Sequence, residues 1–422
     1  MKAPAKPSLA SQLILYAEQV STNASLIAES LEAQNARPTD VIPPELSAAR
    51  LNLIEAAFQL LKLSHDTGSF LINLTVDYQV ICAFKWLCHF NIPNLVPANG
   101  TIDYVQLAQA SGAPERILRS ALGLVMGSGL FEEPEAGCVG HSMVSRQIAL
   151  DESLSHWAQY ISSTIIPTAA KHLEAIEKWP GSRQVNETAH NIAFGHKLSY
   201  FDFVSQDTSR GAQFARTMQA ISSTSAFDSG HLMRSYDWGL LGEGVVVDMG
   251  GSTGHASIAL AEAFPYLTFI VQDLPEVTVD NAQHFQERKL DKSVSSRIKF
   301  QEHSFFDPQP VKAASIYLLR HILHDWPDKE AVQILRNILP ALGPKSRILV
   351  SDIVLPEESG VIPVLEERVM RLNDMLLHQF TNTSERTLRD WKGVFAQVGT
   401  GLRILRVYRH PRSVLSLIEL GR

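Results

Sequence analysis

The chain has 422 residues, 45% of them hydrophobic and 19% charged, which is typical of a folded protein with a large core and excludes a disordered chain. Its formal net charge of −7 argues against a nucleic-acid-binding protein, because such proteins usually carry an excess of basic residues. The length exceeds that of one typical domain, so we expect two domains.

The N-terminal 65 residues show the spacing of amphipathic helices. Leu9, Leu13 and Tyr16 recur at helical intervals, and apolar residues between 51 and 61 do the same. Three prolines within residues 35–46 predict a loop between these helices.

The next segment predicts three helices followed by a small hairpin. Residues 80–90 form a strongly apolar helix, Thr101 is a suitable N-cap for a second helix, and residues 116–125 form a third. Two short strands around a Pro/Gly turn then occupy residues 130–141. This order is typical of a winged-helix domain, which we place at about 65–150. In so acidic a chain we interpret it as a dimerisation or pocket-lining module.

Beyond residue 150 the pattern changes from helices alone to alternating strands and helices. Residues 152–180 and 196–235 predict further helices, and 329–342 predicts a helix with one apolar stripe. Short apolar runs that predict strands lie at 245–248, 268–272, 298–301, 315–320, 347–353 and 402–408. The alternation predicts an α/β fold with a Rossmann-like parallel sheet covered on both faces. We divide the chain into a helical and winged-helix part, 1–190, and a catalytic part, 191–422.

No segment predicts export or membrane insertion. The N-terminus lacks the apolar run of a signal peptide, and no window reaches the roughly 18 apolar residues of a membrane span. Cys82, Cys88 and Cys138 lack the spacing of a metal site, so we expect buried free thiols in a reducing compartment. The expectation is a cytoplasmic protein without a membrane partner.

A glycine-rich turn follows the first predicted strand of the sheet. Gly250 and Gly251 allow a sharp turn and close approach of a ligand, and Gly254 allows the next helix to pack near the strand. Asp248 ends that strand, and Asp273 ends the next one, where a carboxylate can bind both hydroxyls of a ribose. The spacing differs from the dinucleotide fingerprint, and a carboxylate beside the turn would repel a pyrophosphate and favour a cationic sulfonium. These features predict a site for S-adenosylmethionine.

His324 is the best placed of the 15 histidines to act as a general base. It follows the predicted strand 315–320, so it is expected at the carboxyl edge of the sheet, and a base helps because a phenol is mostly protonated at neutral pH. Asp352 at another strand end and Glu385 before a helix are candidates to hold the second imidazole nitrogen. The alternatives are a core or solvated histidine for His324, a strand-end cap for Asp352 and a helix N-terminal acid for Glu385.

The chain resembles the plant-type small-molecule O-methyltransferase family in its fungal branch. The motifs that carry the resemblance extend over most of the chain and lie at 247–255, 271–276, 305–306, 317–326, 351–356 and 384–387. The patterns around 92–93 and 131–134 are similar to the winged-helix dimerisation domain of that family. The resemblance implies methylation of hydroxyl groups from S-adenosylmethionine, without a metal, by a homodimer.

The resemblance also implies roles for single residues. It makes His324 the catalytic base, Asp352 and Glu385 its acidic partners, and Asp273 the ligand of the cofactor ribose. The other residues expected around the cofactor, besides Asp248 and the three glycines, are Leu274, Ser304, Phe305 and Arg320. The family usually has an aspartate where this chain has Ser304, in the turn expected to contact the adenine. We interpret Asp325 and Asp328 as acids at the start of a helix.

Three functions stay open at this level. The first is methylation of a hydroxyl on a small aromatic or polyketide-like molecule. The second is a non-methylating catalyst of the same fold, which directs dehydration or a pericyclic cyclisation by polarising a carbonyl; Ser304, His156, His172 and His321 keep it open. The third is a winged-helix regulator that binds DNA, against which the pI of about 6.1 argues. The His324, Asp352 and Glu385 set favours the first.

Overall fold

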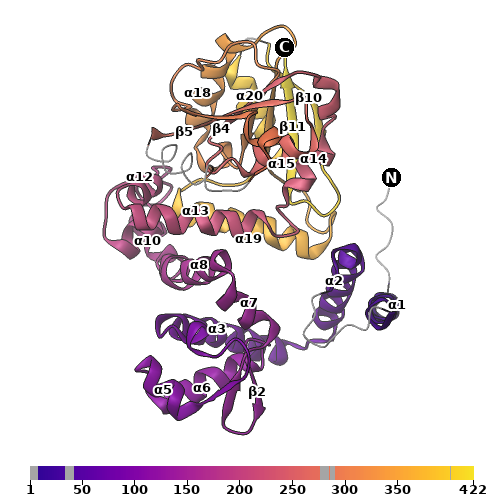
Figure 1. The fold of residues 1–422 in the computed structure, drawn as a ribbon, viewed down its shortest axis with the longest axis vertical. Helices are drawn as coiled ribbons and strands as arrows, with labels where there is room; N and C mark the ends of the chain where they lie inside the picture. Colours follow the sequence, from indigo (N-terminus) through magenta and orange to yellow (C-terminus); the bar gives the residue numbers. More distant parts are fainter. Residues whose placement is uncertain (1–7, 34–41, 276–284, 286–289, 400) are drawn as a thin grey trace. The chain divides into compact units, whose positions relative to one another are not determined.

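The computed structural model describes residues 8–33, 42–275, 285, 290–399 and 401–422 (Figure 1). The chain separates into two compact units: unit 1 comprises residues 1–150 and 363–365, and unit 2 comprises 151–362 and 366–422. The functional division that we expect after residue 190 stays a prediction.

Unit 1 consists of helices, as predicted, and a three-stranded antiparallel sheet, in which the predicted hairpin is joined by a third strand that was not predicted. Its helices are α1 (Leu9–Ala33), η1 (Pro44–Leu46), α2 (Ser47–Ser64), α3 (Thr67–His89), α4 (Ile92–Leu95), α5 (Tyr104–Ser111), α6 (Glu115–Met126) and α7 (Met143–Leu150). Its strands, in the spatial order β1-β3-β2, are β1 (Thr101–Asp103), β2 (Glu132–Glu135) and β3 (Cys138–Gly140). Leu87, Leu107, Leu118 and Leu122 form part of a core between α3, α5 and α6. The helices followed by a hairpin match the expected winged-helix pattern.

Two local expectations in unit 1 were wrong. Thr101 is not an N-cap but begins β1, and the carboxylate of Asp103 caps α5 by accepting from the backbone N–H of Gln106. The three cysteines are free, as predicted, but they are not buried: Cys82 is exposed, and Cys88 and Cys138 are only partly buried. Among the described helices, none is both long and apolar enough to cross a membrane.

Unit 2 is built on a sheet with the strand order β10-β11-β8-β7-β4-β5-β6, and β9 pairs with β8. The strands are β4 (Val245–Met249), β5 (Thr268–Asp273), β6 (Ile298–Glu302), β7 (Ile316–Arg320), β8 (Arg347–Leu355), β9 (Arg386–Thr387), β10 (Arg403–Tyr408) and β11 (Leu415–Gly421). The six predicted strands are confirmed, and β4 to β8 pair in parallel. The sheet is not parallel throughout, because β11, which the sequence analysis missed, pairs antiparallel with β8 and β10.

Helices cover both faces of this sheet, because its strands carry apolar side chains on both faces. Successive residues of β4 point to opposite faces: Val246 packs in one apolar cluster, and Val247 packs in the other. The first cluster includes residues of α14 (Ser229–Ser235) and α15 (His255–Ala263), with α17 (Lys292–Ser295) beside them. The second includes residues of α18 (Asp328–Ile338) and α20 (Leu388–Val398). A strand buried on both faces reads as a continuous apolar run, as the sequence showed.

A layer of further helices completes unit 2. It comprises α8 (Glu152–Tyr160), η2 (Ile161–Ile165), α9 (Ile166–Ala169), α10 (His172–Lys178), α11 (Ala189–Phe194), α12 (Tyr200–Ser205), α13 (Thr208–Ser222) and α19 (Val364–Phe380). Short helical turns elsewhere are η3 (Trp238–Leu241), η4 (Leu323–Asp325) and η5 (Leu339–Ala341). The predicted helix 152–180 is interrupted by the π-helical turn η2, and 196–235 forms three helices capped by Ser199, Asp207 and Asp228.

Candidate active site

The turn after β4 can be built only with glycines. Gly250 has φ of +70°, and a Cβ there would lie 2.5 Å from Cδ1 of Ile322. A Cβ on Gly251 would lie 2.7 Å from Cγ of Asp248 and 2.8 Å from Cγ1 of Val271. The sequence-predicted turn therefore sits tightly between the end of β5 and the segment that follows β7.

The two predicted acids border this turn in different environments. Asp248 is buried and accepts a 2.6 Å hydrogen bond from Ser257 Oγ, and its burial raises the pKa of the carboxyl. Asp273 is at the end of β5, and its two oxygens accept from the backbone N–H groups of Ser252 at 2.8 Å and of Leu274 at 2.9 Å. These bonds orient the Asp273 carboxylate at the carboxyl end of the strand.

His324 lies in η4, directly after β7, and one of its nitrogens is held by a carboxylate. Nδ1 of His324 is 2.9 Å from Oε1 of Glu385, and both side chains are buried. Nε2 lies 3.7 Å from Oδ1 of Asp325. The geometry therefore leaves Nε2 to face an incoming group. The predicted pair of His324 and Glu385 is brought together.

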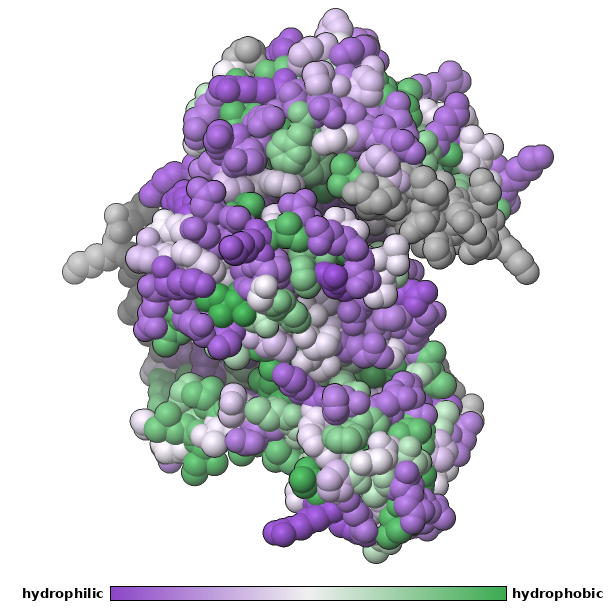
Figure 2. Space-filling model, turned by 90° about the vertical axis from the view of Figure 1, so that its left-hand side faces the viewer, coloured by the Kyte–Doolittle hydropathy of each residue, from purple (hydrophilic) through white to green (hydrophobic). Residues whose placement is uncertain are grey.

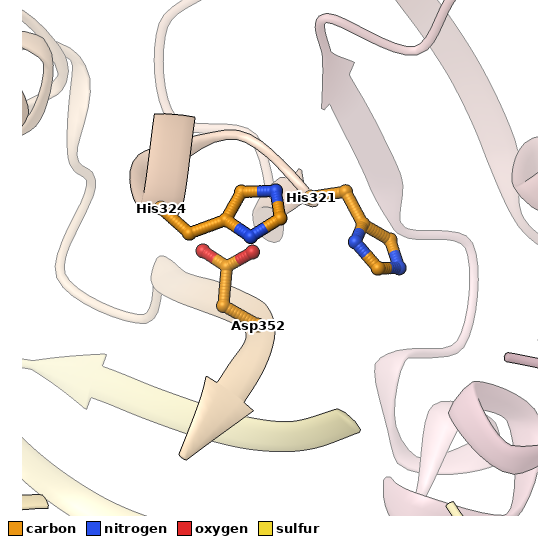
Figure 3. Close-up of side chains that lie close together, drawn as sticks. All are labelled: His321, His324 and Asp352. Atoms are coloured by element: carbon orange, nitrogen blue, oxygen red, sulfur yellow. The ribbon is translucent and has the colours of Figure 1, made fainter. Parts of the chain in front are cut away.

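Asp352 completes the predicted set but does not bond to the histidine. It is 0% exposed, and neither of its carboxylate oxygens has a hydrogen-bond partner among the residues that the structure describes. One donor atom from each of Asp352, His324 and His321 lies within 4.8 Å of the other two. Figure 3 shows the carboxylate of Asp352 facing the His324 ring, with His321 beside it.

The buried charges around His324 change its protonation. Burial lowers the pKa of His324, but Asp325, Glu385 and Asp352 outweigh this effect and raise it to about 10. Burial raises the pKa of Asp325 to about 6 and that of Asp352 to about 7, although the neighbouring imidazole opposes both shifts. The cluster therefore stabilises a proton on the imidazole of His324.

The base and the glycine turn lie next to each other. Ile322, two residues before His324, is the side chain that a Cβ on Gly250 would strike, and Phe305 would lie 3.6 Å from the same Cβ. Phe305 packs against Trp326, and the Oγ of Ser304 accepts from the backbone N–H of Phe306 at 3.3 Å. The predicted cofactor residues of the turn and of the 304–305 segment therefore border the segment that carries His324.

Arg320, the last residue of β7, is buried behind this segment. Its guanidinium lies 2.9 Å from Nε2 of His255 and donates to the carbonyl of Phe227 at 2.8 Å. Burial lowers the pKa of Arg320, and the charges of Asp248 and Asp352 oppose that shift. Arg320 thus supplies a fixed positive charge between the two acidic groups of the site.

Two residues that the sequence analysis did not place in the site also belong to it. Asp325, interpreted as a helix-start acid, precedes α18 and lies beside the base, whereas Asp328 is in the first turn of α18 as predicted. Arg386 donates to the carbonyls of Leu323 and Trp326 and to Asp328, so it fixes the backbone around η4. In the sequence, the position of Arg386 next to Glu385 was the one feature that could have identified it.

Comparisons with known proteins identify the family of this chain. A model of the O-methyltransferase domain matches residues 180–400. The O-methyltransferase bfoD of Aspergillus brasiliensis is 53% identical over 418 residues, which cover 98% of each chain. The O-methyltransferase VdtC of Byssochlamys spectabilis is 41% identical, over 91% of this chain and 89% of its own.

Solved structures share the fold at lower identity. The crystal structure of OxaC has a TM-score of 0.76 at 20% identity and covers 98% of this chain and 99% of its own. The structure of LepI in complex with SAM has a TM-score of 0.73 at 22% identity and covers 96% and 98%. OxaC has also been solved with SAH and oxaline. At these identities the likeness shows the fold alone.

Proposed function

Because this chain belongs to the O-methyltransferase family, we propose that it methylates a hydroxyl of a small aromatic or polyketide-like molecule, with His324 as the general base. The chain is an O-methyltransferase, and S-adenosylmethionine is its methyl donor. The observation that carries the proposal is the 2.9 Å contact between His324 Nδ1 and Glu385, on a segment that borders the glycine turn.

The residues at the turn fit the methyl donor. Gly250 and Gly251 carry no side chain, so a ligand can approach the backbone of the turn closely. Asp273 would bind the ribose hydroxyls, and Ser304 and Phe305 would contact the adenine. Gly254 and Leu274 would border the donor, and Arg320 would fix the charge behind it. When bound, the donor supplies an electrophilic methyl carbon and a positive charge that Asp248 favours.

The chain's own residues then handle the proton of the acceptor. With Nδ1–H donating to Glu385, the tautomer of His324 presents Nε2 as the atom that accepts the hydroxyl proton. Asp325 and Asp352 stabilise the imidazolium that forms. The oxygen left behind gains the methyl group, so the expected product is a methyl ether.

Labelled methyl donor and a panel of phenols test this proposal. We expect label to appear on an oxygen, and replacement of His324→Ala to lower kcat by roughly 10²- to 10⁴-fold. Calorimetry should show that the variant still binds the donor. Failure of every panel member to accept label, or a His324→Ala variant as active as the parent, would refute it. The cyclisation alternative gains nothing from the solved structures, since likeness at 20–22% identity concerns the fold alone.

We also propose that the protein is a homodimer and resides in the cytoplasm. Helix α3 exposes a continuous series of large apolar side chains, between 40% and 68% exposed, and they are Phe70, Leu71, Ile72, Leu74, Val76, Tyr78 and Ile81. Figure 2 shows hydrophobic side chains on the surface of unit 1. Apolar surface of this extent usually marks a contact with another chain, and a second copy is the partner that the family resemblance favours. The free thiols fit a reducing compartment, which cell fractionation would test.

A further inference from the structure

Two imidazoles and one carboxylate converge at the carboxyl ends of β7 and β8. His321 and His324 come from the segment after β7, and Asp352 comes from β8 (Figure 3). One possible donor atom from each lies within 4.8 Å of the other two. Two histidines and one carboxylate are a ligand set that Zn²⁺ and its neighbours in the transition series accept.

The state of Asp352 is a second and independent observation that favours a cation site. The side chain is 0% exposed, and both oxygens lack a hydrogen-bond partner among the described residues. A buried carboxylate without partners is costly, so it calls for an ion or a water that satisfies it. A metal ion held with His321 and His324 would satisfy it directly.

The surroundings of His324 are those of a metal-bound imidazole. Its Nδ1 is held by Glu385 at 2.9 Å, and such an outer carboxylate orients a metal-bound histidine and makes it a better ligand. Nε2 is then the nitrogen left to bind the ion, and Oδ1 of Asp325, 3.7 Å from it, is within reach as a further ligand.

The backbone at His321 holds its ring near the base. This residue has φ of 56°, a left-handed conformation, and its N–H donates to the carbonyl of Ser351 on β8 at 3.0 Å. For a residue other than glycine such a conformation costs on the order of 1–3 kcal/mol and is often kept for function. The bond to β8 anchors His321 to the same strand as Asp352.

We propose that His321, His324 and Asp352 bind one divalent transition-metal ion, of the Zn²⁺ class, and that the bound ion inhibits methyl transfer. The ion would occupy the nitrogen that accepts the hydroxyl proton, so it acts as an inhibitor and not as a cofactor. The inhibition rests on the proposed role of His324, whereas binding does not. Donors up to 4.8 Å apart must approach by about 1 Å to meet at metal–ligand distances of about 2.0–2.2 Å, which small side-chain rotations supply.

Metal binding is tested first, without any activity measurement. Tag-free protein is titrated with Co²⁺ and its visible spectrum recorded, and bound Zn²⁺ is counted by equilibrium dialysis. We expect one ion per chain, and at least a tenfold loss of affinity in both His321→Ala and Asp352→Asn. The matched control is His410→Ala, because its ring stacks on His231 at 4.7 Å and forms another imidazole pair in the protein. Its affinity should equal that of the parent.

Three outcomes would overturn the binding site. They are no bound ion, an affinity unchanged in His321→Ala and Asp352→Asn, and the strong thiolate absorption expected if Co²⁺ sat on exposed Cys82. Inhibition is tested next. For each enzyme we would measure the Zn²⁺ concentration that halves the rate which that enzyme shows without metal. That concentration should rise at least tenfold in His321→Ala. An ion that binds without slowing the parent enzyme would overturn the inhibitory step and would count against His324 as the base.

Discussion

The chemistry of the site depends on three acids around one imidazole. In the free protein Asp325, Glu385 and Asp352 raise the pKa of His324 to about 10, so the base holds a proton at neutral pH. A base must be unprotonated to accept the hydroxyl proton of the acceptor. The kcat/KM of the enzyme should therefore rise with pH as His324 loses its proton.

Removing one of these acids should lower the pH at which kcat/KM rises. In Glu385→Gln the imidazolium loses one negative neighbour, so the pKa of His324 falls and the ascending limb of kcat/KM moves to lower pH, by about one pH unit or more. The loss of the acceptor that fixes the tautomer also lowers the maximal rate. A pH–rate profile of parent and variant measures both effects. Exposed Glu262→Gln is the control, and a limb that stays in place in Glu385→Gln would contradict the assignment.

The glycine turn allows an equally direct test. In Gly251→Ala the new methyl group would lie 2.7 Å from Cγ of Asp248, so the turn must open. Overpacking of this kind costs about 1–3 kcal/mol, or roughly 5- to 150-fold in the Kd of the methyl donor if the loss falls on binding. Calorimetry with the donor measures it. Gly393→Ala is the control, because a Cβ there meets nothing within 4 Å among the described residues. Unchanged donor affinity in Gly251→Ala would disprove the close approach.

Single residues of the site were predictable where the chain carries a local signal. His324 follows a buried strand and stands in a motif, and Glu385 stands in another, so both were identified. Asp325 was not, because an acid shortly before a helix ordinarily faces solvent, and only the turn η4 places it beside Nε2. The lack of partners for Asp352 was also beyond the sequence, since it depends on all the elements packed around β8.

At the scale of elements, the two-residue strand β9 holds the site together. It pairs with β8 and places Glu385 and Arg386 next to the segment that carries His324. Arg386 bonds to the carbonyls of Leu323 at 2.8 Å and of Trp326 at 2.8 Å, so one guanidinium fixes both ends of η4. We interpret Arg386 as a positioning residue that acts through His324.

The role of Arg386 predicts a selective loss of rate. In Arg386→Lys a single ammonium cannot make the forked set of bonds, so η4 loosens and the free energy of unfolding falls by about 1–3 kcal/mol. A base displaced by about 1 Å would lower kcat by up to roughly 100-fold while donor affinity stays constant. Rate assays, calorimetry and urea unfolding measure the three quantities. Arg389→Lys, an exposed position three residues on, should change none of them. A fully active Arg386→Lys enzyme would contradict this role.

The elements of the sheet were more predictable than those of the helical layer. Strands β4, β7 and β8 are buried on both faces, so each reads as an apolar run that ends in a polar residue or a turn. β11 was missed although all its residues are buried, because no predicted helix separates it from β10. The helices predicted over 152–180 are present, but the π-helical turn η2 among them was not predictable, because Ile161–Ile165 contain neither glycine nor proline.

At the scale of the whole molecule, we assign different roles to the two units. Unit 2 contains every residue that we place in the catalytic and cofactor site, whereas unit 1 contributes α3 with its exposed apolar side chains. If α3 served only the core of its own chain, these apolar side chains would be buried within that chain. Their exposure is the physical argument for the proposed second chain, and the family resemblance favours a copy of the same protein.

A charge placed on α3 should therefore separate the copies. Ile72 is 68% exposed, so Ile72→Glu costs little within one chain but would bury an unpaired carboxylate between two chains. We expect the mass measured by light scattering to be that of two chains for the parent and to fall towards one chain for the variant, while the free energy of unfolding at low concentration stays the same. Leu240→Glu is the matched control, because Leu240 is 83% exposed and lies in unit 2. A parent protein that elutes as a single chain, or an Ile72→Glu variant that still pairs, would show that α3 is not where two copies meet.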